Sequence, residues 1–279
     1  LVAGLLPSDS RVPESFVTTL IESSIALQVS NLITPSDPSH VVRLPMVAAS
    51  PTASWVAEGE EIEATDAELD EAVAEYFKIA GLTILSREAI RDADAATLDL
   101  IMSGLARDIA RKVDAAYFGT AGASTVQPPG LGDLEGVDAI ATAGTGWTDL
   151  DPFIAARLNA AAVGSNLTAW VTSPTDAGGL AMIRESEGSA RGLLQPDPTQ
   201  PTRSLIDGLP VLVTPAVEAG TVWGVPQLTS HVVVRQDIDA EASDQQFFTS
   251  QRVAVVGSAR VGFAWTHPAG IARITTTAA

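Results

Sequence analysis

The stretch that decides the fold is Trp55-Val-Ala-Glu-Gly-Glu-Glu-Ile-Glu-Ala-Thr-Asp-Ala-Glu-Leu-Asp-Glu-Ala-Val-Ala-Glu75, followed directly by Tyr76-Phe-Lys-Ile-Ala-Gly-Leu-Thr-Ile-Leu85. Its first part carries nine carboxylates and no basic side chain. Its second part is rich in aromatic and β-branched residues and has no turn signal, so it predicts a strand. Together the two parts predict a long acidic β-hairpin over residues 51–85.

The residues after this stretch predict a long helix over 95–118. Apolar side chains recur there at steps of three and four, which places them on one stripe of a helix. The stripe consists of Leu98, Ile101, Met102, Leu105, Ile109, Val113, Ala116 and Tyr117. Arg107 and Arg111 lie one turn apart on the opposite face, near the C-terminal end, where the helix dipole favours cations.

A Gly- and Pro-rich segment over 119–146 divides the chain. After it, helices are predicted at 152–163, with Asp151 as the cap, and at 174–185, with Ser173 as the cap. Strands are predicted at 169–172, 209–214, 222–225 and 231–235, and the apolar stretch 247–265 is typical of paired strands. The pattern indicates an α+β fold without a strict βαβ repeat.

The chain is strongly acidic. It has 16 lysines and arginines and 34 aspartates and glutamates, which gives a formal net charge of -18. Such a chain has no electrostatic attraction for phosphate backbones or anionic lipids, which argues against nonspecific nucleic-acid binding. The absence of cysteine excludes disulfides, thiolate metal sites and cysteine nucleophiles. No apolar run reaches the length of a membrane helix.

No motif for catalysis or metal binding stands out. His40, His231 and His267 lie far apart in the chain, and no serine has the G-x-S-x-G context of a nucleophile elbow. Neither H-E-x-x-H nor a phosphate-binding G-x-x-x-x-G-K occurs. We therefore expect no catalytic residue, no metal site and no cofactor. A hydrolase that uses one of the histidines is the distant alternative.

The acidic run from Glu58 to Glu75 allows three interpretations. It could bind calcium, although it lacks the ligand order of an EF-hand loop. It could be a solvated charged face, which is the usual role of a charge run. It could also contact a second copy of the chain, because a two-stranded hairpin whose carboxylates repel each other is marginal in water. The predicted contact residues are Trp55, Glu58, Glu60, Glu61 and Glu63 in one copy and Arg87, Arg91, Arg107 and Arg111 in its neighbour.

Several motifs follow one another in a recognisable order along nearly the whole chain. They are Trp55-Val-Ala-Glu58, Lys78-Ile-Ala-Gly-Leu-Thr-Ile84, Ala116-Tyr-Phe-Gly-Thr-Ala-Gly122, Pro129-Gly-Leu-Gly-Asp-Leu-Glu-Gly136, Trp170-Val-Thr-Ser-Pro174 and Gly208-Leu-Pro-Val211. In this order they resemble the motifs of tailed-bacteriophage major capsid proteins, the family whose fold is shared with encapsulins.

The resemblance implies an α+β phage major capsid fold. Its parts are an N-terminal arm (1–34), a peripheral domain (35–127) with the extended loop (51–85) and the spine helix (95–118), an axial α/β domain (128–232), a return to the peripheral domain (233–265) and a C-terminal strand in the axial domain (266–279).

The resemblance also implies a structural role. Copies would form hexamers and pentamers of an icosahedral shell that encloses the double-stranded DNA of a tailed phage without binding it specifically, and no membrane would be involved. Assembly would take place in the cytoplasm of the bacterial host, and the finished protein would reside in the virion. Other expected partners are a portal, a scaffolding segment or protease during assembly, and a decoration protein. No scaffolding-like segment precedes Leu1, so the chain is expected to be the processed form. An encapsulin-type nanocompartment shell is the first alternative.

Some members of this family join their subunits by an isopeptide bond between a lysine at the hairpin tip and an asparagine, with the help of a catalytic glutamate. Here the tip reads Gly59-Glu-Glu-Ile62, Gln251 stands near the acceptor position, and Ser258 occupies the position of the glutamate. The resemblance therefore implies a shell that is held together by noncovalent contacts.

Overall fold

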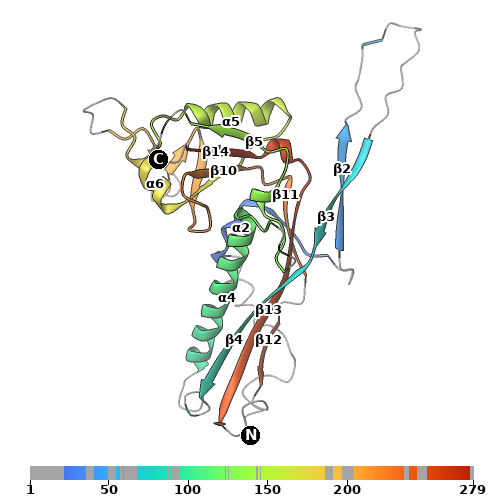
Figure 1. Ribbon diagram of the computed structural model, residues 1–279, viewed down its shortest axis with the longest axis vertical. Helices are drawn as coiled ribbons and strands as arrows, with labels where there is room; N and C mark the ends of the chain where they lie inside the picture. Colours follow the sequence, from blue (N-terminus) through green and yellow to red (C-terminus); the bar gives the residue numbers. More distant parts are fainter. Residues whose placement is uncertain are drawn as a thin grey trace.

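The computed structural model combines helices with two large β-sheets, in agreement with the predicted α+β class. The residues it describes are 22–35, 41–49, 55–56, 59, 68–86, 88, 95–122, 124, 126–142, 144, 146–185, 191–196, 204–235, 239–243 and 250–276. Figure 1 shows an elongated molecule in which a long helix runs alongside one sheet, the second sheet lies at one end, and a hairpin projects from the side.

The long helix α4 (Ala95–Phe118) has the bounds that the apolar stripe predicts. Its buried side chains, among them Ile109, Val113 and Tyr117, pack against a five-stranded sheet. The strands of this sheet are β1 (Asn31–Ile33), β11 (Ser230–Val234), β13 (Arg252–Trp265), β12 (Asp239–Ser243) and β4 (Phe77–Ser86). Most helical stability in proteins comes from such packing of an apolar face, so the sheet holds α4 in place.

The acidic hairpin exists, but its strands pair differently from the prediction. Strand β3 (Glu68–Glu75) pairs antiparallel with β2 (Val41–Ala49) in a separate two-stranded sheet. A strand does form where residues 76–85 predict one, but this strand, β4, pairs with β13 and not with the acidic segment. Of the predicted tip, Gly59-Glu-Glu-Ile62, the structure describes only Gly59, and residues 60–67 lie outside the described residues.

Burial explains why β4 joins β13. Ile79 of β4 packs, together with Leu105 of α4, against the core beneath that helix. The buried Val261 of β13, opposite Phe77 in the register, lines the same core. A strand dense in carboxylates would have to be desolvated to cover this surface, and burying unpaired charge is costly.

Residues 247–265 predict paired strands, whereas the described part of this stretch holds a single 14-residue strand, β13. Its first half lies between β4 and β12, and its second half pairs with β11. Both faces of the second half are buried. Phe263 and Trp265 join the core beneath α4, and Ala264 packs beneath the hairpin. A strand that is buried on both faces needs apolar residues at every position, so its sequence lacks the alternation of polar and apolar residues.

The second sheet has seven strands of mixed direction. In spatial order they are β5 (Asp138–Ala141), β14 (Ala272–Thr275), β10 (Thr221–Val225), β6 (Ala169–Thr172), β9 (Leu209–Val213), β8 (Ser204–Ile206) and β7 (Gln195–Pro196). Helices α5 (Asp151–Ala162) and α6 (Pro174–Ala181) share a core with one face of this sheet, built around Phe153, Trp170 and Leu180.

The ends of α5 and α6 differ in part from the prediction. Ser173 caps α6 as predicted, because its side chain accepts a hydrogen bond from the N–H of Asp176. The same helix stops at Ala181 and not near 185, since Arg184 forms a β-bridge with Gly192 instead. At α5, Leu150 is the N-cap, and Asp151 lies in the first turn.

A buried carboxylate ties the start of the described chain to α4. Asp114 is 4% exposed. It accepts hydrogen bonds from the Ser24 hydroxyl at 2.6 Å and from the backbone N–H groups of Ile25 and Ala26 at 3.1 and 2.9 Å. These donors lie at the N-terminus of α2 (Ile25–Val29). Burial raises the pKa of Asp114, although the three hydrogen bonds partly offset this effect.

A second carboxylate closes the loop that follows α4. Asp133 accepts hydrogen bonds from the backbone N–H groups of Ala121, Gly122 and Gly130. Burial alone would raise the pKa of Asp133, but the three N–H donors outweigh burial and hold the pKa below its usual value. The loop after the helix is thus held by one charged side chain.

We expect Asp133→Asn to lower the free energy of unfolding by about 1 kcal/mol at neutral pH, because an amide oxygen accepts hydrogen bonds less strongly than a carboxylate. A group with a depressed pKa stabilises the fold above its unfolded-state pKa of about 4, and this contribution is lost as the pH falls through the folded-state value. The difference between the variant and the wild type should therefore shrink in acid. Urea unfolding at neutral pH and at about pH 3 measures it. An undiminished difference in acid would contradict the role of the charge.

Candidate assembly surfaces

The described part of the β2–β3 hairpin has one apolar face and one charged face, as alternation along the strands requires. The apolar face packs on the five-stranded sheet through Val42, Leu44, Met46, Ala72 and Ala74. Glu71, Val73 and Glu75 point the other way and are exposed. Arg43 of β2 pairs with Glu71 at 2.9 Å. The hairpin is therefore seated on its own chain at its base and presents a largely acidic face to its surroundings (Figure 1).

Three of the nine predicted contact residues are described. Trp55 is fully exposed just beyond the hairpin strand β2, and Arg107 and Arg111 are exposed on α4. The other six lie outside the described residues: Glu58, Glu60, Glu61, Glu63, Arg87 and Arg91. In Figure 1, α4 and the β2–β3 hairpin lie on opposite sides of the β4–β13 pair, so α4 lies away from β3.

The exposed face of α4 offers positive charge. The side chain of Arg107 donates a hydrogen bond to the carbonyl oxygen of Ser103, and neither Arg107 nor Arg111 forms an ion pair with a residue that the structure describes. Lys112 and Asp108, also exposed, stand four residues apart beside them. Across this face the described cations outnumber the carboxylate, which makes it suited to an acidic partner.

A second exposed surface, which was not predicted from the sequence, lies on the face of the β4–β13 pair away from α4. Leu82 and Ile84 of β4 are 58% and 42% exposed there. Val256 of β13 stands opposite Leu82 in the register and is also exposed. Lys78 and Arg260, which stand opposite each other, flank this apolar patch. The signal in the sequence is that Ala80, Leu82 and Ile84 form an apolar set, as do Ile79 and Leu85 on the other side of the strand, although α4 can cover only one side.

The two positions that the isopeptide chemistry would need lie on β13 or beside it. Gln251 is exposed in the turn before β13, with φ at +52°. Ser258 stands opposite Ala80 on the same side of the sheet as the apolar patch. These two positions hold an amide and a hydroxyl.

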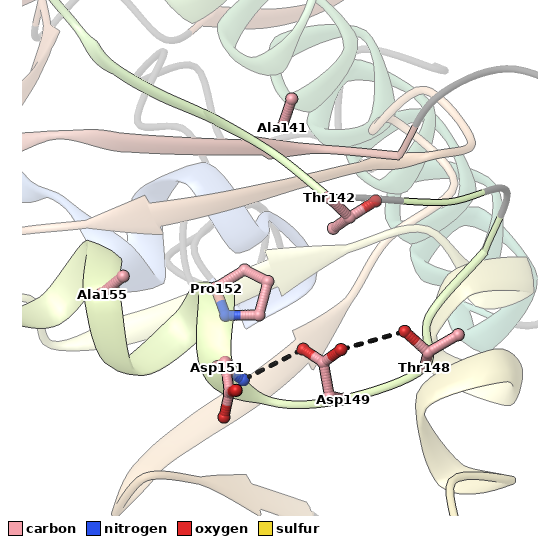
Figure 2. A pocket seen from close by; sticks show the side chains of 7 residues that line it. All are labelled: Ala141, Thr142, Thr148, Asp149, Asp151, Pro152 and Ala155. Carbon is pink, nitrogen blue, oxygen red and sulfur yellow. Dashed lines mark hydrogen bonds between the residues drawn. The ribbon is translucent and has the colours of Figure 1, made fainter.

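The second sheet carries a depression of about 340 Å³ at the N-terminus of α5. Figure 2 shows Asp149 in its wall, accepting hydrogen bonds from the Thr148 hydroxyl and from the N–H of Asp151. These bonds form the turn that starts α5. The residues that line the depression include no histidine, lysine or arginine. We therefore assign Asp149 a structural role.

Two of the three histidines lie among the described residues. His231 lies in β11, and burial lowers its pKa. His267 places its Nε2 atom 3.1 Å from the carbonyl oxygen of Val163, and His40 lies outside the described residues. Among the described side chains, no group of three or more His, Asp or Glu residues is arranged to hold a metal ion. Within the same part of the chain, no helix has the length and apolar content that crossing a membrane requires.

The sequence of this chain matches a known protein family. The family model for the phage capsid family matches residues 5–276. The capsid polyprotein of Pseudomonas phage PAJU2 is 26% identical over 176 residues, or 60% of this chain. The chain spans about a quarter (26%) of the length of that relative.

Solved structures show the same fold. A chain from Mycobacterium phage Adephagia matches with a TM-score of 0.72 at 16% identity, and the match covers 92% of this chain and 91% of that chain. A chain from Microbacterium phage Oxtober96 matches with a TM-score of 0.72 at 18% identity over 99% and 98% of the two chains. The capsid of an empty GTA particle gives 0.72 at 16% identity over 92% and 90%. At such identities the likeness shows the fold alone, and this fold is the predicted one.

Proposed function

Because the chain belongs to the phage capsid family, we propose that it is the major capsid protein of a tailed phage, whose copies assemble into hexamers and pentamers of an icosahedral shell. The observation that carries this proposal is the β2–β3 hairpin, which leaves the body of the molecule and exposes an acidic face. A two-stranded hairpin is marginal in water without further packing. A neighbouring copy that covers the hairpin supplies this packing.

The proposed contact joins opposite charges. The acidic residues Glu58, Glu60, Glu61 and Glu63, with Trp55 as an apolar anchor, meet Arg87, Arg91, Arg107 and Arg111 of the next copy. Support comes from α4, where Arg107 and Arg111 are exposed and have no ion-pair partner among the described residues. A fully exposed tryptophan is a typical anchor of a protein interface.

We further propose the division into an N-terminal arm (1–34), a peripheral domain (35–127 and 233–265) and an axial domain (128–232 and the strand in 266–279). One observation supports it. The core built around Phe153, Trp170 and Leu180 is a cluster separate from the core beneath α4, to which the opposite face of the second sheet contributes Val171, Trp223 and Val225. Axial domains would meet at the centre of each hexamer or pentamer.

The proposed shell encloses double-stranded DNA without binding it. A wall with a net charge of -18 per copy repels the phosphate backbone, which lets the DNA enter and leave without adhering. Noncovalent contacts hold the shell together. Assembly takes place in the host cytoplasm with a portal and with a scaffolding segment or protease, and a decoration protein binds later. The role is structural, and the shell protein itself catalyses no reaction.

Purification of the chain alone tests the proposal. We expect closed particles in negative-stain micrographs and elution in the void volume of a size-exclusion column. Particles isolated from phage-producing cells should contain double-stranded DNA, whereas packaged protein would identify a nanocompartment instead. A chain that stays a monomer or a small oligomer at every concentration and salt tested would overturn self-assembly.

A further inference from the structure

Strand β3 crosses strand β13 at Gly262, where the two backbones are in direct contact. A Cβ atom at position 262 would lie 2.4 Å from the carbonyl oxygen of Glu75 and 3.7 Å from the Cβ atom of Ala74. So close an approach of two backbones requires a residue without a side chain. Glu75 is the last residue of β3, so this crossing lies at the base of the hairpin.

The two partners at the crossing are held with unequal strength. On the β13 side, Gly262 pairs with Val233 of β11, and its neighbours Val261 and Phe263 are buried in the core beneath α4. On the hairpin side, a small apolar cluster seats the base, and the opposite face is exposed. An atom added at position 262 should therefore displace the hairpin and leave β13 in place.

We propose that Gly262 is the pivot that sets the angle at which the hairpin leaves the body, and that this angle determines whether the hairpin reaches a neighbouring copy. The second half of this inference rests on the proposed function. The first half concerns the isolated chain and is tested separately.

The expected displacement follows from the geometry of a lever. Phe77, two residues beyond Glu75, is hydrogen-bonded into the ladder between β4 and β13 and therefore stays in place. It is the fixed end of the lever, and the contact with position 262 is the point at which the strand is pushed. A side chain at 262 would push the Glu75 carbonyl away by about 1 Å to reach ordinary contact distance. At about 3.3 Å per residue, that shift tilts the strand by about 9° and moves Asp70 by about 3.5 Å.

A pair of spin labels measures this angle. The chain has no cysteine, so Asp70→Cys on the hairpin and Leu100→Cys on α4 provide two unique attachment sites, both exposed. The labelled chain is diluted with unlabelled chain so that only distances within one copy are observed. In this background Gly262→Ala should shift the mean label distance by up to about 3.5 Å and reduce the particle yield at least about tenfold.

Gly81→Ala is the matched control in the same sheet. Its Cβ atom would meet only the end of the Leu105 side chain, at 2.4 Å, and that side chain can rotate away. Gly81 lies on the side of β4 that faces α4, away from the hairpin. The label distance and the particle yield should both stay at their wild-type values.

The outcomes separate the pivot from the proposed function. An unchanged label distance in Gly262→Ala would overturn the pivot, whatever the particle yield. A shifted distance with an undiminished yield would support the pivot and overturn the use of the hairpin in assembly. If Gly262→Ala does not fold, Ala74→Gly probes the same contact from the hairpin side. Removal of this buried methyl group should broaden the distance distribution, and a distribution as narrow as that of the wild type would overturn the pivot.

Discussion

The double variant Arg107→Glu/Arg111→Glu is expected to remain folded and to form no particles. Both side chains are exposed on α4, and substitutions at such positions change the free energy of unfolding by no more than about 0.5 kcal/mol. In the proposed contact, each reversal replaces an attraction by a repulsion. An exposed ion pair is worth about 0.2–1 kcal/mol, so two reversals weaken each contact by about 1–3 kcal/mol. Every copy in the shell bears this loss, and about 1.4 kcal/mol already changes an association constant tenfold.

Arg184→Glu/Arg191→Glu is the matched control for this prediction. Both arginines are exposed beyond the end of α6, and their reversal makes the net charge of -18 more negative by the same four units. We expect this control to assemble, because its charges lie away from α4. Negative-stain particle counts, with circular dichroism as the test of folding, compare the two variants. Normal assembly of the α4 variant, or an equal failure of both variants, would contradict the contact.

Asp114→Ala is expected to lower the free energy of unfolding by about 3 kcal/mol, because it leaves three donors without an acceptor at a buried site. These donors are the Ser24 hydroxyl and the N–H groups of Ile25 and Ala26. The loss should be local, so hydrogen exchange should accelerate most in α2, which would detach from α4. Urea unfolding and hydrogen exchange measure the two effects. Asp108→Ala, an exposed aspartate on the same helix, is the control and should change stability by less than about 0.5 kcal/mol.

The pH dependence gives Asp114 a second signature. Because burial raises its pKa, the folded chain binds this proton more readily than the unfolded chain does. The group therefore stabilises the fold increasingly as the pH falls from the folded-state pKa toward the unfolded value of about 4. The amide side chain of Asp114→Asn does not titrate in this range. The free energy of unfolding of the wild type, relative to that of this variant, should therefore rise as the pH falls through that window. A constant difference would contradict the burial of the charge. Asp133, whose pKa is depressed, should show the opposite slope.

Much of the local structure was predictable from the sequence. The stripe from Leu98 to Tyr117 predicted α4 with its observed bounds, because a 3.6-residue period is a property of the helix itself. Ser173 was predictable as the cap of α6, since the cap bond spans only three residues. The end of α6 was not predictable, because it depends on the bridge from Arg184 to Gly192.

The candidate surfaces were predictable in part. The exposure of Arg107 and Arg111 followed from their place opposite the apolar stripe. The exposure of Leu82 and Ile84 was not predicted, because the sequence pattern places their strand in the acidic hairpin, whereas it belongs to the sheet beneath α4. Their apolar character is visible in the sequence, but which side of a strand is covered depends on what packs there.

The sequence alone determined the class of the fold, the long helix and the acidic character of the projecting strand, because each follows from residues that are neighbours along the chain. Only the tertiary structure decided that β3 pairs with β2, that β4 pairs with β13, and that Gly262 lies under Glu75. The physical reason is that every strand offers the same backbone N–H and C=O groups, so hydrogen bonding alone does not select its partner. The choice among them is made by the apolar area that each arrangement buries and by the charge that it leaves in water.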